Sequence, residues 1–157
     1  MVRNRRFRSG KFAVWLLLAS ASLMASRAFA TLGEDASSIK SDQAHLKASV
    51  RVLPKRLYSV DEMQTSSGTT IQQFVSSDGR VFAVSWRGSA PNLRQLLGSY
   101  FDEYLRAADA QPAPRGRAVH IETGDLVVDA GGHMRFHVGR AFLKSRLPQG
   151  VSADEIH

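Results

Sequence analysis

The side chains with the greatest chemical potential cluster around a glycine pair near the C-terminal end of the chain. Five polar residues flank Gly131-Gly132: Asp125, Asp129, His133, Arg135 and His137. Carboxylates and imidazoles together are typical of metal sites and acid–base pairs, and an arginine binds anions. Trp86 is a further candidate, since an exposed indole ring stacks on flat ligands.

A β-hairpin brings these polar residues to one face of a sheet. With a three-residue loop over residues 130–132, Asp129 faces His133 and Asp125 faces His137. A two-residue loop would instead place Leu126 opposite His137 and mix polar with apolar side chains, which a half-buried sheet disfavours. The sequence therefore predicts the longer loop and a charged hairpin face.

Three interpretations of this face stay open: a solvated surface with cross-strand ion pairs, a site for an anionic ligand, and a catalytic or metal site. His133 and His137 are four residues apart, which is about 13 Å along a strand. One ion bound at about 2 Å by both rings is not compatible with that separation. We therefore expect no metal and no cofactor.

The preceding segments indicate the scaffold that holds this hairpin. Apolar residues at helical spacing predict a first helix over residues 35–51, ended by Pro54, and a longer amphipathic helix from Asn92 to Ala108. Alternating or β-rich segments predict strands near residues 57–64, 69–75, 81–86, 118–122, 125–129 and 133–143.

These elements define the expected fold class. The chain is α+β, with an antiparallel sheet of about five or six strands, one long amphipathic helix packed on it and a second, N-terminal helix. We expect one buried aromatic and aliphatic cluster in its core: Phe82, Trp86, Leu97, Phe101 and Phe136. Replacing Phe101 by alanine in such a core would cost roughly 3–5 kcal/mol.

The first thirty residues read as a secretory signal peptide. They combine a basic start, an apolar segment from Phe12 to Ala19 and small residues at Ala28 and Ala30. The apolar segment is shorter than the roughly 20 residues of a membrane span. Residues 1–30 are therefore predicted to be removed, and residues 31–157 to form a single exported domain with no stable membrane span, in the periplasm or outside the cell.

The leader also accounts for most of the basicity of the chain. It holds six of the 21 lysines and arginines and none of the 14 acidic residues, so residues 31–157 carry a net charge of only +1. Nucleic-acid binding depends on a cationic surface, and we expect none. The chain has no cysteine, which excludes disulfides and thiol chemistry.

Several sequence blocks resemble a family of small exported proteobacterial proteins that is classed only as a domain of unknown function. The resemblance rests on six blocks: residues 79–88, 91–93, 96–101, 131–134, 139–142 and 147–151. One departure is visible, because Gly88 is followed by Ser89 where the family often has proline. The family has no established activity, cofactor or catalytic residue, so the resemblance assigns none here.

The function expected from the sequence is that of a non-enzymatic binding or accessory protein of the cell envelope. Its partner would be an envelope protein or a small ligand. The alternative is a periplasmic hydrolase or other enzyme that uses the His/Asp hairpin face. No G-x-S-x-G, H-E-x-x-H, P-loop or G-x-G-x-x-G motif is present in the sequence to support an enzyme.

The leader generates a prediction on processing. Signal peptidase should cleave after Ala30, so that the mature chain begins at Thr31. Intact-mass and N-terminal peptide mass spectrometry of the exported protein will check this. Detection of Met1 or of the apolar segment in the exported protein would show that the leader is retained.

Overall fold

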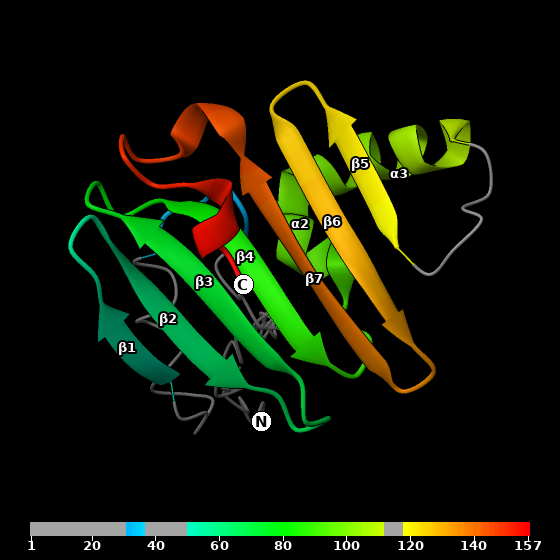
Figure 1. Ribbon diagram of the computed structural model, residues 1–157, viewed down its shortest axis with the longest axis horizontal. Helices are drawn as coiled ribbons and strands as arrows, with labels where there is room; N and C mark the ends of the chain where they lie inside the picture. Colours follow the sequence, from blue (N-terminus) through cyan, green and yellow to red (C-terminus); the bar gives the residue numbers. More distant parts are fainter. Residues whose placement is uncertain (1–30, 37–49, 112–117) are drawn as a thin grey trace, which may run out of the picture.

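The protein forms one antiparallel sheet of seven strands in the order β1-β2-β3-β4-β7-β6-β5 (Figure 1). The computed structural model describes residues 31–36, 50–111 and 118–157. The strands are β1 (Val50–Pro54), β2 (Tyr58–Gln64), β3 (Thr70–Ser76), β4 (Val81–Gly88), β5 (Val119–Thr123), β6 (Leu126–His133) and β7 (Phe136–Leu143). The predicted α+β class is confirmed, with seven strands in place of five or six.

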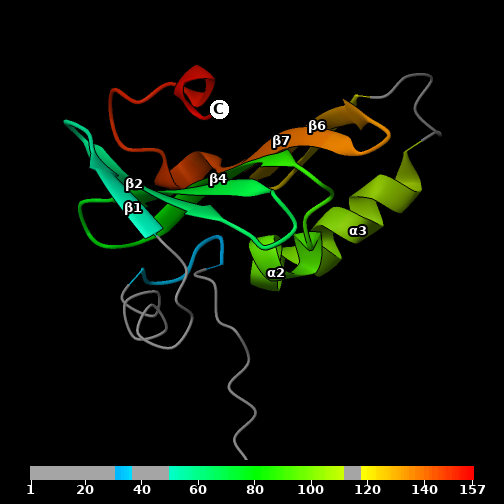
Figure 2. The same cartoon turned by 90° about the horizontal axis from the view of Figure 1, so that it is seen from below.

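Two different layers cover the two faces of this sheet. One face carries an 18-residue helical segment that comprises α2 (Leu93–Leu97), the 3-10 turn η1 (Gly98–Tyr100) and α3 (Phe101–Ala110). The opposite face carries the C-terminal tail, with the short turns η2 (Lys144–Arg146) and η3 (Ala153–Glu155). Figure 2 shows the helices below the sheet and the tail above it.

The predicted N-terminal helix is absent from the described residues. Asp35 forms an isolated bridge with Arg80, and Val50 and Arg51 belong to strand β1. The rest of the predicted helix, residues 37–49, lies outside the described residues. Pro54 ends a strand rather than a helix, and it is tolerated because β1 is an edge strand, where one N–H faces no partner.

Each layer encloses its own hydrophobic core. The larger core lies between sheet and helices and includes Trp86 and Leu97. The smaller lies between sheet and tail and is anchored by the fully buried Ile156. Phe74 and Phe82 belong to the smaller core, with ring centroids 6.2 Å apart. Burial on both faces explains why β4, the central strand, is apolar along most of its length.

The single aromatic cluster expected from the sequence is therefore wrong. The pairing of β3 with β4 skips Phe82, since Phe74 pairs with Ala83 and Val75 pairs with Val81. This irregularity turns Phe82 toward the tail while Trp86 faces the helices. Phe101 is only partly buried and Phe136 is 38% exposed, so truncation of Phe101 should cost less than a fully buried aromatic would.

Gly98 interrupts the helical segment for a packing reason. Its φ of +52° is unfavourable for other residues, and a Cβ atom at this position would lie 2.8 Å from Cβ of Thr31. The glycine therefore leaves room for the side chain of Thr31. The same segment of chain buries Leu32, whose N–H donates to the carbonyl of Leu96 at 3.0 Å.

The helical segment gives a prediction on stability. Leu97 is fully buried and Leu105, on the same segment, is 41% exposed. Leu97→Ala should lower the free energy of unfolding by about 2–5 kcal/mol, because it removes buried methyl groups and leaves a cavity. Leu105→Ala should lower it by less than about 1 kcal/mol. Urea denaturation of both variants measures this, and equal losses would contradict the packing described above.

Candidate functional site

A row of polar side chains crosses the tail-side face of the sheet. Cross-strand neighbours share a face of a sheet, and successive pairs in the register connect seven strands without a break. In strand order β1 to β5 the row is Arg51, Glu62, Gln72, Ser85, Arg140, Asp129 and His120. This continuous polar row interrupts the apolar residues that the same face contributes to the smaller core.

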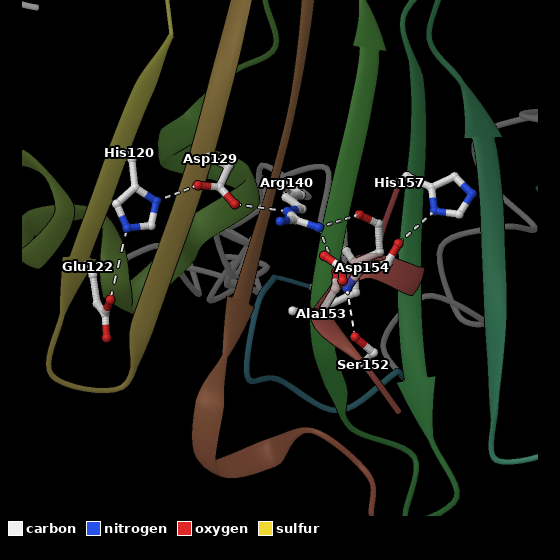
Figure 3. Close-up of polar contacts among 9 residues, drawn as sticks. His120, Glu122, Asp129, Arg140, Ser152, Ala153, Asp154 and His157 are labelled. Atoms are coloured by element: carbon white, nitrogen blue, oxygen red, sulfur yellow. Dashed lines mark hydrogen bonds and ion pairs between the residues drawn. The ribbon is translucent and has the colours of Figure 1, made fainter. Parts of the chain in front are cut away.

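Asp129 makes side-chain contacts with both of its neighbours in this row. Its Oδ1 lies 2.6 Å from Nδ1 of His120, and its Oδ2 accepts a hydrogen bond of 2.9 Å from Nε of Arg140. Figure 3 shows the three side chains in line across β5, β6 and β7. Both carboxylate oxygens are therefore engaged, which fixes the orientation of all three side chains.

Arg140 also binds the C-terminal tail. Its Nη1 donates to the carbonyl of Ala153 at 2.6 Å and reaches the carbonyl of Ile156 at 3.4 Å (Figure 3). The Ser152 and Glu155 side chains form a capping box that closes the turn η3 between these two carbonyls. One guanidinium thus connects the sheet to the segment that covers it.

A groove of about 780 Å³ opens beside this row. One wall is the polar row from Glu62 to His120, and a second is the end of the tail, at Ile156 and His157. Its floor is made of small or apolar residues of β6 and β7: Ala130, Gly131, Val138 and Gly139. A glycine in a strand interior allows a ligand to approach the backbone closely.

Trp86 lies under this floor. It pairs with Gly139 across strands β4 and β7, and a Cβ atom on Gly139 would be 2.3 Å from the indole ring. The absence of that Cβ lets the ring pack closely against β7. Trp86 is only 4% exposed, so it belongs to the core and supports the groove from beneath, rather than offering an open stacking surface.

A second recess, of about 460 Å³, lies on the helix side of the same glycine-rich region. Trp86, His133 and His137 line it together with the residues that lead into α2. The structure thus brings three of the sequence-predicted residues around one recess. His133 stacks on Phe136 at a centroid distance of 5.7 Å, and its Nδ1 lies 3.1 Å from the carbonyl oxygen of Met134.

The hairpin register predicted from the sequence is wrong. The loop is the two-residue turn Met134-Arg135, so that Gly132 pairs with His137 and Leu126 pairs with Leu143. Gly131 and Gly132 lie within β6, where a Cβ atom on Gly132 would come within 2.3 Å of the carbonyl oxygen of Phe136. These glycines permit close packing of two strands and do not form the turn.

This register separates the five predicted polar residues. Asp129 faces Arg140 instead of His133. Asp125 accepts hydrogen bonds from the backbone N–H and the hydroxyl of Ser145, both at 2.6 Å, and so closes the turn after β7. Arg135 is at the exposed hairpin tip, with a φ of +74°. Asp125 and Arg135 line neither recess, and the charged hairpin face does not assemble.

Sequence reasoning missed two residues that carry the site, His120 and Arg140. Each is followed in the sequence by a buried residue, Ile121 or Ala141. Because side chains alternate along a strand, His120 and Arg140 lie on the face opposite to these buried neighbours. Their partner Asp129 was identified, but its neighbours follow only from the order of the strands. The Ser152-x-x-Glu155 capping box was a further readable signal that the tail is ordered.

The electrostatics of the row centre on Asp129. Partial burial raises the pKa of its carboxyl, but the hydrogen bonds from His120 and Arg140 and the positive charge of Arg140 outweigh burial, and the pKa lies below its ordinary value of 3.8. The carboxylate is consequently ionised near neutral pH and balances the charge of Arg140.

The described residues contain neither a metal-binding cluster nor a helix that could span a membrane. Residues 31–36, 50–111 and 118–157 contain no group of three or more histidine, cysteine or acidic side chains with the geometry of a metal site. Across the same ranges, no helix combines the length and hydropathy of a membrane span.

Comparison with known families identifies the sequence class. Residues 28–156 match the model of a family described as protein of unknown function, DUF2844. The chain belongs to this family. The matched region of this DUF2844 protein includes the whole sheet, the helices, His120, Asp129, Arg140 and nearly all of the tail. No curated protein and no solved structure is detectably similar to it.

The low pKa of Asp129 leads to a prediction on pH dependence. A carboxyl whose pKa is lower in the folded state adds stability above its unfolded pKa of about 3.9, and that stability is lost as the pH falls through the folded value. At pH 7, Asp129→Asn should be less stable than the wild type by on the order of 1 kcal/mol, after allowance for the exposed third of the side chain.

Urea denaturation between pH 2 and pH 7 checks this prediction. The difference between wild type and Asp129→Asn should shrink below about pH 4. Asp109→Asn, at an exposed position near the end of α3, is the matched control and should follow the wild type. A difference that is constant with pH, or that grows in acid, would contradict the ion pair.

Proposed function

We propose that this DUF2844 protein is a non-enzymatic, exported binding protein of the cell envelope that holds a small ligand in the tail-side groove. The observation that supports this most directly is the groove itself, whose volume of about 780 Å³ is within the range of small-molecule sites. Its location in the envelope rests on the leader sequence and on the prediction for Thr31.

The construction of the groove favours binding. Its polar wall is fixed before any ligand arrives, because Gln72 donates to Glu62 at 2.8 Å and Arg140 and His120 hold Asp129. Preorganised groups lose little conformational freedom when a ligand binds. The glycine-containing floor gives the apolar part of a ligand direct contact with the backbone of β6 and β7.

The hydrolase alternative has weaker support. His120 and Asp129 form a contact that resembles part of an acid–base pair, but Nε2 of His120 points toward Glu122, at 3.9 Å, and not toward a hydroxyl nucleophile. Glu122 is itself paired with Lys144 at 2.7 Å. In the described residues these groups neutralise one another, an arrangement that stabilises charge and does not prepare a base for proton abstraction.

Gly131→Val tests the proposed function. Its φ is not in the left-handed region, so valine fits a strand conformation here while its side chain fills the floor of the groove. Native mass spectrometry of the protein incubated with periplasmic extract should show a small molecule bound to the wild type and lost from Gly131→Val. Gln64→Val, an exposed strand position outside the groove, should retain it.

Two results would contradict the proposal. One is a wild-type protein that retains no small molecule from the extract. The other is a folded Gly131→Val variant, with an unchanged melting temperature, that retains the same molecule as the wild type.

A further inference from the structure

The groove contains one cationic side chain, Arg87, that is in a different cross-strand row from the charged residues described above. Arg87 lines the groove, and it shares a cross-strand row with Thr70, Val138 and Gly131. This second row runs parallel to the polar row and crosses the floor itself. Arg87 is exposed, and within the described residues it has no ion-pair partner.

The other charged groups of the groove are already satisfied or lie farther from the floor. Arg140 and Asp129 neutralise each other. Glu62 accepts a hydrogen bond from Gln72 and is on β2, three strands from β7 in the sheet order. At about 4.8 Å per strand that is about 14 Å, whereas Arg87 on β4 is one strand from Val138. A ligand on the floor therefore meets a cation first.

The residues of the floor indicate the chemistry of the ligand beyond its charged group. Val138 offers an apolar side chain to the groove, and Gly131, its cross-strand partner, has no side chain to cover the backbone of β6. Ile156, whose side chain is fully buried, marks the end of the groove on the side of the tail. The surface beside Arg87 is thus suited to an apolar body, and the guanidinium to one negative group, which it binds with paired N–H donors.

We propose that the groove binds an anionic amphiphile, with a carboxylate or phosphate head on Arg87 and an apolar body along the floor formed by β6 and β7. This rests on the proposed binding function and specifies its ligand class. Carboxylate and phosphate share the chemistry that Arg87 recognises, and a fatty acid or a lipid phosphate would each supply it.

Four probes with the same chain and different heads test the class: dodecanoate, dodecyl phosphate, dodecanol and dodecyltrimethylammonium, each below its micellar concentration. Trp86 is the only tryptophan of residues 31–157 and lies against Gly139, so its emission reports binding in the protein purified from the periplasm. At least one anionic probe should saturate with an affinity about tenfold or more above that of dodecanol. The tighter of the two anions identifies the head as carboxylate or phosphate.

Substitution of Arg87 tests whether this side chain causes the preference for an anionic head. Arg87→Gln should weaken binding of the anionic probe by about tenfold and leave that of dodecanol unchanged. Arg146→Gln, an exposed arginine of η2 outside the groove, should change neither. Gly131→Val should weaken all the probes, because it occupies the floor that the apolar body needs.

The outcomes separate the ligand class from the binding function. Equal affinities for all four heads, a preference for dodecyltrimethylammonium, or an Arg87→Gln variant with wild-type affinity would overturn the anionic class. The binding function would still hold if Gly131→Val also released the periplasmic molecule. If Gly131→Val affected neither the probes nor the periplasmic molecule, the class and the function would both be wrong.

Discussion

The interaction on which most of this structure depends is the set of hydrogen bonds made by Arg140. Its guanidinium binds Asp129 within the sheet and the carbonyls of Ala153 and Ile156 in the tail. A partly buried arginine is costly without partners, and its fixed planar donors bind several acceptors at once. Arg140 therefore places the tail, and the tail in turn forms a wall of the groove and covers the smaller core.

The two hydrophobic cores stabilise opposite faces of the sheet. The helix-side core contains most of the buried apolar residues, and the tail-side core is smaller and closes on Ile156. Because the tail covers only part of its face, the remainder of that face stays open beside the polar row. The groove is thus the consequence of a tail that covers only part of one face of the sheet.

Glycines at particular strand positions shape the functional region. Gly139 makes room for the ring of Trp86 on one face, and Gly131 lines the groove on the other. Glycine weakens a strand because it contributes no side-chain packing. Gly131, whose cross-strand partner is Val138, therefore marks a place on the groove side where a ligand can make contact with the backbone.

The sequence by itself determined the elements whose signal is local. The strands corresponding to β2, β3 and β4 and the amphipathic helix follow from periodicity, and so does the α+β class. The predicted first helix was extended to Arg51, and the described part of that end forms strand β1 instead, because Val50 and Leu53 fit a helical spacing as well as a strand. Only pairing with β2 decides between the two states.

Tertiary structure decided the site. Asp129 was identified from its residue type, but its partners, His120 and Arg140, come from strands whose order and register no local pattern fixes. The hairpin loop is Met134-Arg135 and not residues 130–132 as predicted, so every cross-strand pair differs from those of the predicted face. Local spacing determines which side chains share a face of one strand, whereas packing against two cores determines which strands, and therefore which charges, become neighbours.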